Sequence, residues 1–459
     1  MIRLFQVFIP AGVLTLLLTD TLIVLGCFLG AASLFLEVDL DLFLLDEGGL
    51  LRIGVAVATI MFAAYFRDFY SSGHGRSPIL LLHSLSMVIG TTLIAQGLIS
   101  YFSVRLRAPL RVMLPGCFCS MVLLFAWRLF YSAVVWKIAA QRVLFVGSSP
   151  LLEDIRARAS KHDDMGLSVV GYVDDESPDS APQGAKIIGP LSQLKEIAEA
   201  VKPDRIIIGL KERRDRMPVD TLLELRFAGY AIEEVASFYE KTCRRISSKD
   251  LRPAQLIFSN EFVSHNDWFT GAFDVLFSLV CLILALPLVM IIAAAVKLTS
   301  RGPVLYRQRR VGENNVPFTL FKFRSMYVDA EKHTGAVWST ANDPRVTPVG
   351  RYLRKLRLDE LPQFFNVLRR EMSLVGPRPE RPEFVKILSE KIPYYRQRHA
   401  VKPGITGWAQ INYRYGETFE DAVRKLEYDL YYIKYMSSSL NNYILFATLK
   451  IMFLGRGAQ

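Results

Sequence analysis

The chain has 459 residues, of which 51% are hydrophobic, and a formal net charge of +11. This length exceeds what one hydrophobic core usually serves, so we expect several domains. The apolar residues form long runs and basic residues flank them, which indicates a lipid bilayer and phosphorylated partners and argues against nucleic acid. The five cysteines have no paired CxxC spacing and the histidines form no ligand pair, so neither a disulfide framework nor a zinc site is indicated.

Four apolar stretches open the chain, at 13–36, 53–66, 79–102 and 112–136. Each is near the length of about 20 residues that a helix needs to cross a bilayer. They predict a four-helix transmembrane bundle over residues 1–138. Basic residues after the second and fourth stretches place both ends of the bundle in the cytoplasm, although the loop with Arg105, Arg107 and Arg111 opposes this orientation.

Residues 139–235 alternate between apolar strands and helical segments, which predicts a Rossmann-like α/β domain with a parallel sheet. The turn after the first strand reads GSSPLL at 147–152 and lacks the second and third glycines of the dinucleotide fingerprint. A role in packing, regulation or dimer contact is therefore favoured, and nucleotide binding stays open.

A polar linker is expected at 236–270, followed by a catalytic domain at 271–459. The catalytic domain begins with an apolar run at 273–296 that has Pro287 near its middle, where proline removes a backbone hydrogen bond and bends a helix. Basic residues lie on both sides of this run, and the positive-inside rule places both flanks in the cytoplasm. The pattern favours a re-entrant membrane helix over a kinked fifth span.

The last third of the chain contains a series of motifs. They read FKFRSM at 321–326, DPRVTPVG at 343–350, LDELPQ at 358–363, GPRP at 376–379 and KPGITGWAQ at 402–410. In this order they resemble the bacterial sugar transferase family, the monotopic phosphoglycosyl transferases. The regions ahead of them resemble the large members that initiate exopolysaccharide or O-antigen synthesis, in particular the exosortase-associated exopolysaccharide sugar transferases. The resemblance implies a mainly α, monotopic catalytic domain.

Asp359 and Glu360 are the predicted catalytic residues. Pro362 suits the first turn of a helix that continues through Leu368, so both carboxylates lie at or just before its N-terminus, where the dipole stabilises an anion by about 0.3–1 kcal/mol. The resemblance implies that Asp359 attacks the β-phosphate of a UDP-sugar to form a covalent phosphosugar–aspartate intermediate, assisted by Glu360. An isolated Asp-Glu pair is more often a cap and a solvated charge. The ordered motifs favour catalysis.

The candidate substrate-binding residues are Lys322, Arg324, Arg378, Arg414 and Asp429. A diphosphate needs positive charge for positioning and stabilisation. Lys322 and Arg324 alternate with two phenylalanines, which predicts a strand with both charges on one face; an amphipathic strand at an interface is the alternative. Arg378 lies between prolines that hold its backbone extended, so its guanidinium can meet phosphate oxygens. Arg414 and Asp429 rest on the resemblance.

Magnesium is the expected cofactor, with Asp359 and Glu360 as its ligands beside substrate phosphates. The resemblance implies a UDP-sugar donor and undecaprenyl phosphate as the lipid acceptor, and it is consistent with a homodimer. The expected location is the bacterial inner membrane, as a multi-pass protein with its catalytic domain on the cytoplasmic face. The segment at 440–454 either lies on the membrane surface as an amphipathic helix or packs on the catalytic core.

Two rival functions are a membrane-bound nucleotide-sugar dehydratase and a non-catalytic scaffold for polysaccharide assembly. The dehydratase needs a glycine-rich dinucleotide turn in the C-terminal domain, and none occurs after residue 297. The presence of Asp359, Glu360 and Arg378 argues against a scaffold. The sequence leaves open which sugar is transferred.

Overall fold

The structure is a computed structural model, and it describes all residues except 1, 5–6, 10, 71–76, 136–139, 162–165, 176–185, 211–216, 249–250, 252, 259–261, 263–267, 329, 331–342, 414–417 and 455–459. The chain forms two compact units. The first comprises Phe8–Phe238 with Met1–Ile2, and the second comprises Tyr239–Gln459 with Arg3–Val7. Two short strands, β1 (Ile2–Leu4) and β2 (Val7–Ile9), pair with each other near the N-terminus.

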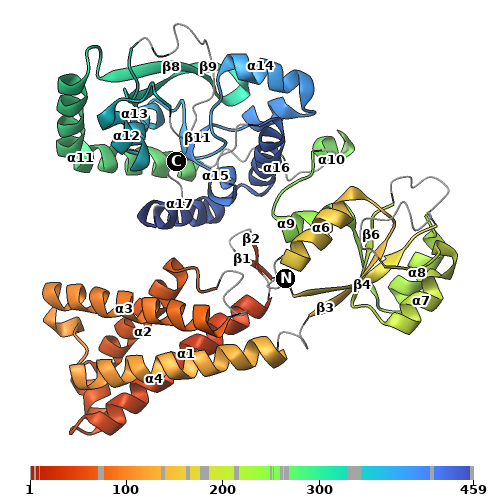
Figure 1. The fold of residues 1–459 in the computed structure, drawn as a ribbon, viewed down its shortest axis with the longest axis horizontal. Coiled ribbons are helices and arrows are strands. Elements are labelled where there is room, and N and C mark those ends of the chain that lie inside the picture. Colours follow the sequence, from red (N-terminus) through yellow and green to blue (C-terminus); the bar gives the residue numbers. More distant parts are fainter. Residues whose placement is uncertain are drawn as a thin grey trace. The chain divides into compact units, whose positions relative to one another are not determined.

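The first unit opens with long apolar helices at the positions that the sequence predicts. They are α1 (Ala11–Phe35), α2 (Gly49–Phe66), α3 (Pro78–Phe102) and α4 (Leu110–Phe130). One hydrophobic core, which includes Phe28, Ile60, Leu85 and Val112, joins all four, and Figure 1 shows them lying side by side. Each has the length and composition to cross a membrane.

A parallel sheet with covering helices completes the first unit, as predicted. Its elements are β3 (Gln141–Val146), α6 (Pro150–Lys161), β4 (Leu167–Val173), β5 (Ile187–Gly189), α7 (Leu194–Val201), β6 (Arg205–Ile208), α8 (Val219–Phe227) and β7 (Ala231–Glu234). The strand order is β5-β4-β3-β6-β7, with every pairing parallel. The chain therefore runs outward in one direction and then the other from β3, which is the Rossmann order.

Gly147, the one glycine in the turn after the first strand of the sheet, has a structural explanation. It adopts a φ of +92°, and a Cβ there would lie 2.7 Å from the carbonyl oxygen of Gly209 at the end of β6. The neighbouring amide of Ser149 donates to that same Gly209 oxygen at 3.1 Å. The close packing of the ends of β3 and β6 therefore explains the glycine at this position, and no bound nucleotide is needed to explain it.

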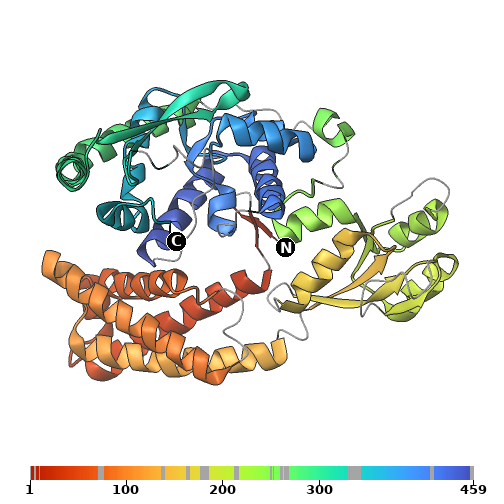
Figure 2. The same cartoon turned by 45° about the horizontal axis from the view of Figure 1, so that its top comes forward.

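The second unit is mainly helical, with two small sheets. Its helices are the part of α9 (Val235–Cys243) from Tyr239 onward, α10 (Pro253–Phe258), α11 (Trp268–Thr299), α12 (Pro348–Lys355), α13 (Gln363–Leu368), α14 (Pro382–Lys391), α15 (Trp408–Asn412), α16 (Phe419–Tyr435) and α17 (Ser438–Phe453). Strands β8 (Leu305–Val311) and β9 (Pro317–Phe323) form an antiparallel ribbon, seen along the top of the unit in Figure 2. Strands β10 (Ser373–Val375) and β11 (Gly404–Thr406) pair in parallel.

The region predicted as a polar linker contains helices α9 and α10. The part from Tyr239 onward belongs to the second unit. The Glu240 carboxylate accepts hydrogen bonds from Lys434 Nζ at 2.8 Å and from the Tyr435 hydroxyl at 3.0 Å, and both of these donors are on α16. The carbonyl of Arg244 accepts from the buried indole of Trp408 at 2.9 Å. These contacts fasten residues 239–248 to the helical core that supports the site.

Helix α11 is the fifth helix with the length and composition of a membrane span. Pro287 lies near its middle, and Figure 1 shows α11 as two straight halves joined by a sharp bend. The first half is anchored by Asp274, whose carboxylate accepts from the Ser373 hydroxyl at 2.5 Å and the Leu374 amide at 3.3 Å. The second half buries Ile292 and Val296 in the core beneath the site.

Helix α17 packs on the core of the second unit with one face and exposes residues of the opposite face. Leu440 and Ile444 are fully buried, and the hydroxyls of Thr448 and Thr406 lie 2.7 Å apart. Phe446 and Leu449 are exposed. Core packing, one of the two alternatives for this segment, therefore accounts for one side of the helix.

Candidate active site

Asp359 and Glu360 lie in a short 3₁₀ turn, Leu358–Glu360, directly before α13. Pro362 is the N-cap residue of α13. The predicted position of the two carboxylates, just before a helix start, is confirmed. Leu358 and Leu361 hold the turn by packing against the core formed by α11, β9 and α12. Apolar burial of these flanking leucines fixes the two carboxylates between them.

Glu360 is held by two cations. Arg378 Nη2 donates to its Oε1 at 2.7 Å, and Lys322 Nζ reaches the same oxygen at 3.3 Å. Burial opposes ionisation, but Arg378 and Lys322 outweigh it and hold the pKa of Glu360 well below its ordinary value. Burial lowers the pKa of Lys322, and the Glu360 charge opposes that effect. The structure thus brings Lys322 and Arg378 together at one anionic oxygen.

Asp359 is placed differently from its neighbour. It is 8% exposed, and within the described part of the chain its carboxylate accepts no hydrogen bond and forms no ion pair. Burial, and then the charge of Glu360, raise the pKa of Asp359, while the charges of Lys322, Arg354 and Arg378 lower it. The Glu360 carboxylate is therefore bound by two cations, whereas the Asp359 carboxylate is available to a ligand.

Asn366 couples α13 to β9, the strand that carries Lys322. Its side chain is fully buried, and its Oδ1 accepts from the amide of Phe321 at 3.1 Å. Its Nδ2 donates to the Thr319 carbonyl and to Glu371, both at 2.7 Å. The bonds to β9 satisfy backbone groups that face away from the two-stranded ribbon. They fix the position of β9, and so of Lys322, relative to α13 and the turn that precedes it.

The GPRP and KPGITGWAQ motifs meet where β10 and β11 pair. A Cβ on Gly376 would overlap the Lys402 carbonyl, and a Cβ on Gly404 would overlap the amide of Gly376. The Gly376 amide donates to the Thr406 carbonyl at 2.9 Å. The two glycines allow the backbones to touch, and the loop that follows carries Arg378 toward Glu360.

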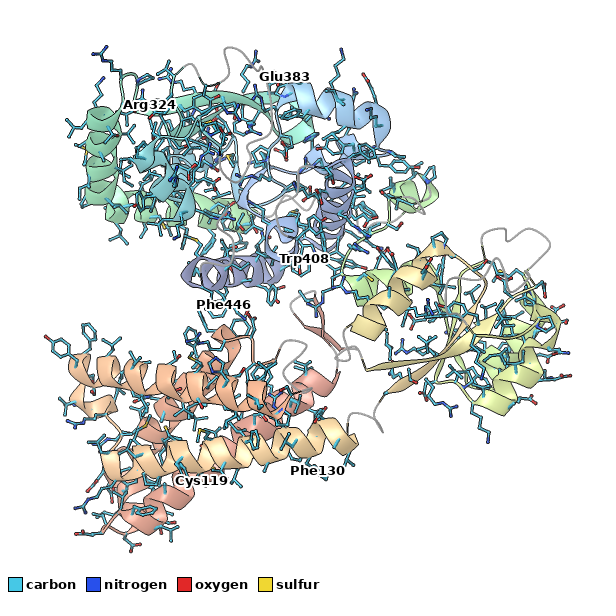
Figure 3. The ribbon with its side chains drawn as sticks, viewed as in Figure 1. Cys119, Phe130, Arg324, Glu383, Trp408 and Phe446 are labelled. Carbon is cyan, nitrogen blue, oxygen red and sulfur yellow. The ribbon has the colours of Figure 1, made fainter. Side chains whose placement is uncertain are left out.

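Arg324 has a different position from the one that its alternation with Lys322 predicts. Strand β9 ends at Phe323, and the Arg324 guanidinium turns to the C-terminal end of α11. It donates to the carbonyls of Arg301 and Ser300 at 2.9 and 2.7 Å and to the Ser300 hydroxyl at 2.7 Å. These bonds satisfy orphan carbonyls at a helix end. Figure 3 labels Arg324 beside this helix.

Asp429 and Arg414 complete the predicted set. Asp429 is 1% exposed and pairs with Arg398, whose Nη2 lies 2.8 Å from its Oδ2. It is therefore shielded from any ligand by its own partner. Arg414 lies outside the described residues. Its neighbour Tyr413 donates from its hydroxyl to Asp421 at 2.5 Å, and Asp421 also forms the capping box of α16 with Thr418.

Several contributing residues escaped the sequence reasoning. Arg354 lies close enough to lower the pKa of Asp359, and its Nε donates to the Ser325 hydroxyl at 2.9 Å. Arg310 donates to the Pro379 carbonyl at 3.0 Å and to Gln308. The DPRVTPVG motif offered a signal for Arg354, because its Thr347 caps α12 and so orients that helix. Arg310 and Arg398 stand in basic runs, RQRR and RQRH, without any pattern that singles them out.

The site's fit to magnesium can be judged from its donors. Oε2 of Glu360 and both oxygens of Asp359 lack partners among the described residues, so hard oxygen donors are present. In that same portion of the chain, no three His, Cys, Asp or Glu side chains group into a metal site. Magnesium is commonly held by one or two carboxylates together with substrate phosphates. The pair fits that mode of binding.

An available carboxylate beside paired cations suits an enzyme that acts on phosphorylated groups. The family model for bacterial sugar transferases matches residues 265–455, which include every motif of the site. The chain belongs to the bacterial sugar transferase family and is a transferase.

Three curated relatives show how far the similarity extends. UDP-N-acetylgalactosamine-undecaprenyl-phosphate N-acetylgalactosaminephosphotransferase of Aeromonas hydrophila is 47% identical over 40% of this chain and 44% of its own length. Undecaprenyl-phosphate glucose phosphotransferase of Komagataeibacter xylinus is 38% identical over 70% of this chain and 60% of its own length. UDP-glucose:undecaprenyl-phosphate glucose-1-phosphate transferase of Klebsiella pneumoniae is 35% identical over 88% of each chain.

A second family model, described as a CoA-binding domain, matches residues 65–226. The match covers part of the apolar helices and the sheet up to α8. It is consistent with the Rossmann strand order of the α/β domain. It establishes a similarity of this region to that family and identifies no ligand.

Proposed function

We propose that this protein transfers a sugar 1-phosphate from a UDP-sugar to undecaprenyl phosphate, with Asp359 as the nucleophile. The observation that carries the proposal is the contrast between the two adjacent carboxylates. Glu360 is paired with Lys322 and Arg378, whereas Asp359 has no partner in the described chain. The names of the relatives supply the substrate classes.

The first step forms a bond between an Asp359 carboxylate oxygen and the β-phosphorus of the UDP-sugar. The bond from that phosphorus to the bridging oxygen breaks, and UMP leaves with the electron pair. The protein retains the sugar phosphate as an acyl phosphate on Asp359. Splitting the transfer in this way divides one hard displacement into two easier ones.

The second step returns the carboxylate to its starting state. A phosphate oxygen of undecaprenyl phosphate attacks the same phosphorus, and the bond to Asp359 breaks. The product is an undecaprenyl diphosphate sugar, the first intermediate of a repeat unit. Because donor and acceptor react in separate steps, ping-pong kinetics follow.

Lys322 and Arg378 supply positive charge for the diphosphate in both steps. Their shared partner Glu360 holds them in place before substrate arrives, so little reorganisation is needed at the moment of reaction. Magnesium bound by Asp359 and Glu360 would neutralise further phosphate charge. Arg414 is a further proposed phosphate ligand.

The bent helix α11 supports a cytoplasmic active site at the bilayer surface. If α11 enters the membrane and returns, the flanking arginines on both sides stay in the cytoplasm, where UDP-sugars are available. The anchored domain then lies near headgroup depth, where a polyprenyl phosphate presents its charged end. The protein is accordingly proposed to act on the cytoplasmic face of the bacterial inner membrane, in exopolysaccharide or O-antigen synthesis.

Release of UMP tests this function directly. Purified protein is incubated with undecaprenyl phosphate, magnesium and one UDP-sugar at a time, beginning with UDP-glucose and UDP-N-acetylgalactosamine. The proposal expects UMP and a lipid-linked product with one of these sugars and none from Asp359→Asn. A protein that releases no UMP with any sugar of the panel is a scaffold or a different enzyme.

A further inference from the structure

A buried arginine, Arg398, connects α16 to the loop that carries Arg378. Arg398 is 4% exposed, and its Nε donates to Asp429 Oδ2 at 3.0 Å. Its Nη1 donates to the Tyr395 hydroxyl at 2.7 Å. Its Nη2, which also pairs with Asp429, donates to the backbone carbonyl of Arg378 at 3.0 Å. One planar guanidinium thus spans a helix, a 3₁₀ turn and the GPRP loop.

The same loop is held at three consecutive carbonyls, those of Pro377, Arg378 and Pro379. The Pro377 oxygen accepts from the Gly404 amide at 3.0 Å, and the Pro379 oxygen accepts from Arg310 at 3.0 Å. Arg310 is in turn paired with Glu380, whose Oε2 lies 3.5 Å from its Nη1. Two arginines, each paired with its own carboxylate, therefore hold the carbonyls of Arg378 and Pro379.

The backbone of Arg378 decides where its guanidinium goes. Pro377 and Pro379 restrict the loop to extended conformations but leave the rotation of the Arg378 peptide unit within that range. The bond from Arg398 to the Arg378 carbonyl fixes that rotation. A guanidinium suits this task because its donors form a rigid planar fork that can serve Asp429 and the carbonyl together.

We propose that Asp429 and Arg398 form a positioning pair that sets the orientation of Arg378 toward Glu360 and the substrate diphosphate. Neither residue touches the substrate. This assigns Asp429 a role through Arg398 and Arg378 in place of direct substrate binding. The proposal rests on the proposed function, because Arg378 matters here as a ligand of the diphosphate.

The informative substitution is Arg398→Lys. A lysine ammonium keeps the positive charge opposite Asp429 but is a compact donor that cannot also reach the Arg378 carbonyl in the geometry of a planar fork. We expect kcat/KM for the UDP-sugar to fall about 10- to 100-fold, with the protein still folded in its thermal unfolding profile. Arg398→Ala is the less useful variant, because it leaves the buried Asp429 unpaired and endangers the fold.

A matched control comes from the same helix. Lys434 of α16 pairs with Glu240 at 2.8 Å, and both side chains are largely buried. This pair joins α16 to α9. The bonds that hold the GPRP loop carbonyls come from Arg398, Arg310 and Gly404. Glu240→Gln should therefore lower the unfolding temperature while changing kcat/KM by less than about threefold.

A double-mutant cycle decides whether Arg398 acts through Arg378. Arg398→Lys is introduced into the wild-type protein and into Arg378→Lys, and kcat/KM is measured in all four proteins. If Arg398 acts by positioning Arg378, the loss of kcat/KM caused by Arg398→Lys falls to less than about threefold in the Arg378→Lys background. An equal loss in both backgrounds overturns the positioning role. Wild-type protein that releases no UMP instead overturns the proposed function, so the two failures are distinguishable.

Discussion

Arg378 donates a 2.7 Å hydrogen bond to the same oxygen of Glu360 that Lys322 approaches at 3.3 Å. A carboxylate shared by two cations serves chiefly to hold those cations. The neighbouring Asp359 escapes this arrangement, since Arg378 and Lys322 both point to Glu360. Glu360 is paired and Asp359 is not because Glu360 is the residue that faces the two cations.

Glu360→Gln should shift the pH dependence of the reaction in a specific direction. Glu360 raises the pKa of Asp359, whereas Lys322 and Arg378 lower it. Removing the Glu360 charge therefore lowers the pKa of Asp359, and the acid limb of kcat/KM moves to lower pH, because the reactive form of Asp359 is the ionised one. The maximal rate should fall as the two cations lose their partner.

The complementary change is Lys322→Gln. Loss of a lowering charge raises the pKa of Asp359, so the acid limb moves to higher pH. The two variants are compared by initial UMP-release rates over a pH series at fixed ionic strength. Acid limbs that coincide for the wild-type protein and both variants would contradict the assignment of that limb to Asp359.

Asn366→Ala should destabilise the catalytic unit. It removes both bonds to β9 and leaves the Phe321 amide and Thr319 carbonyl without that partner, at a cost of about 1–3 kcal/mol for each buried group left unsatisfied. Thermal unfolding followed by circular dichroism measures the loss. Asn412→Ala is the control. Among the described residues its side chain bonds only to the Trp408 carbonyl in its own helix α15, so this variant should lose much less stability.

Arg324→Lys separates two roles for that residue. The structure shows Arg324 bonded to the end of α11, so the lysine variant should unfold at a lower temperature. Its KM for the UDP-sugar should change by less than about threefold, whereas Lys322→Gln should lower kcat/KM by about a hundredfold or more. A large rise in KM for Arg324→Lys at unchanged stability would restore a substrate-binding role.

Much of the fold follows from periodicity in the sequence. The apolar runs, the strand–helix alternation after residue 139 and the helix start after Asp359 all arise from local patterns, and the structure has these elements. Alternation failed at Arg324 because β9 ends one residue earlier, at Phe323, and the free C-terminal carbonyls of α11 attract the guanidinium. Strand ends are set by tertiary contacts that a period-two pattern does not contain.

The site itself was only partly accessible to sequence reasoning. Motifs in the sequence identify Asp359, Glu360, Lys322 and Arg378. In the structure Lys322 and Arg378 both contact one carboxylate oxygen of Glu360. The substrate-binding role of Asp429 was implied only by the family resemblance, and its burial against Arg398 is a tertiary contact that the sequence around it does not reveal. Its partner Arg398 lies 31 residues away, in a turn rich in basic residues.

Cysteine labelling tests the re-entrant form of α11. Trp268 is the first residue of α11, Leu305 lies beyond its C-terminal end, and both are exposed. Each is replaced by cysteine in protein whose five native cysteines have been removed. A membrane-impermeant maleimide should label both positions only from the cytoplasmic side of oriented membrane vesicles. Labelling of the two positions from opposite sides would show that α11 spans the bilayer.

The central claim is that Asp359 becomes covalently bonded to the sugar phosphate. Protein incubated with the UDP-sugar and magnesium, without undecaprenyl phosphate, is quenched and its intact mass and peptides are measured. We expect one added sugar phosphate per protein, located on Asp359, formed together with one equivalent of UMP, and removed on addition of undecaprenyl phosphate. An adduct on a different residue, or lipid product formed at a wild-type rate by Asp359→Asn, would contradict it.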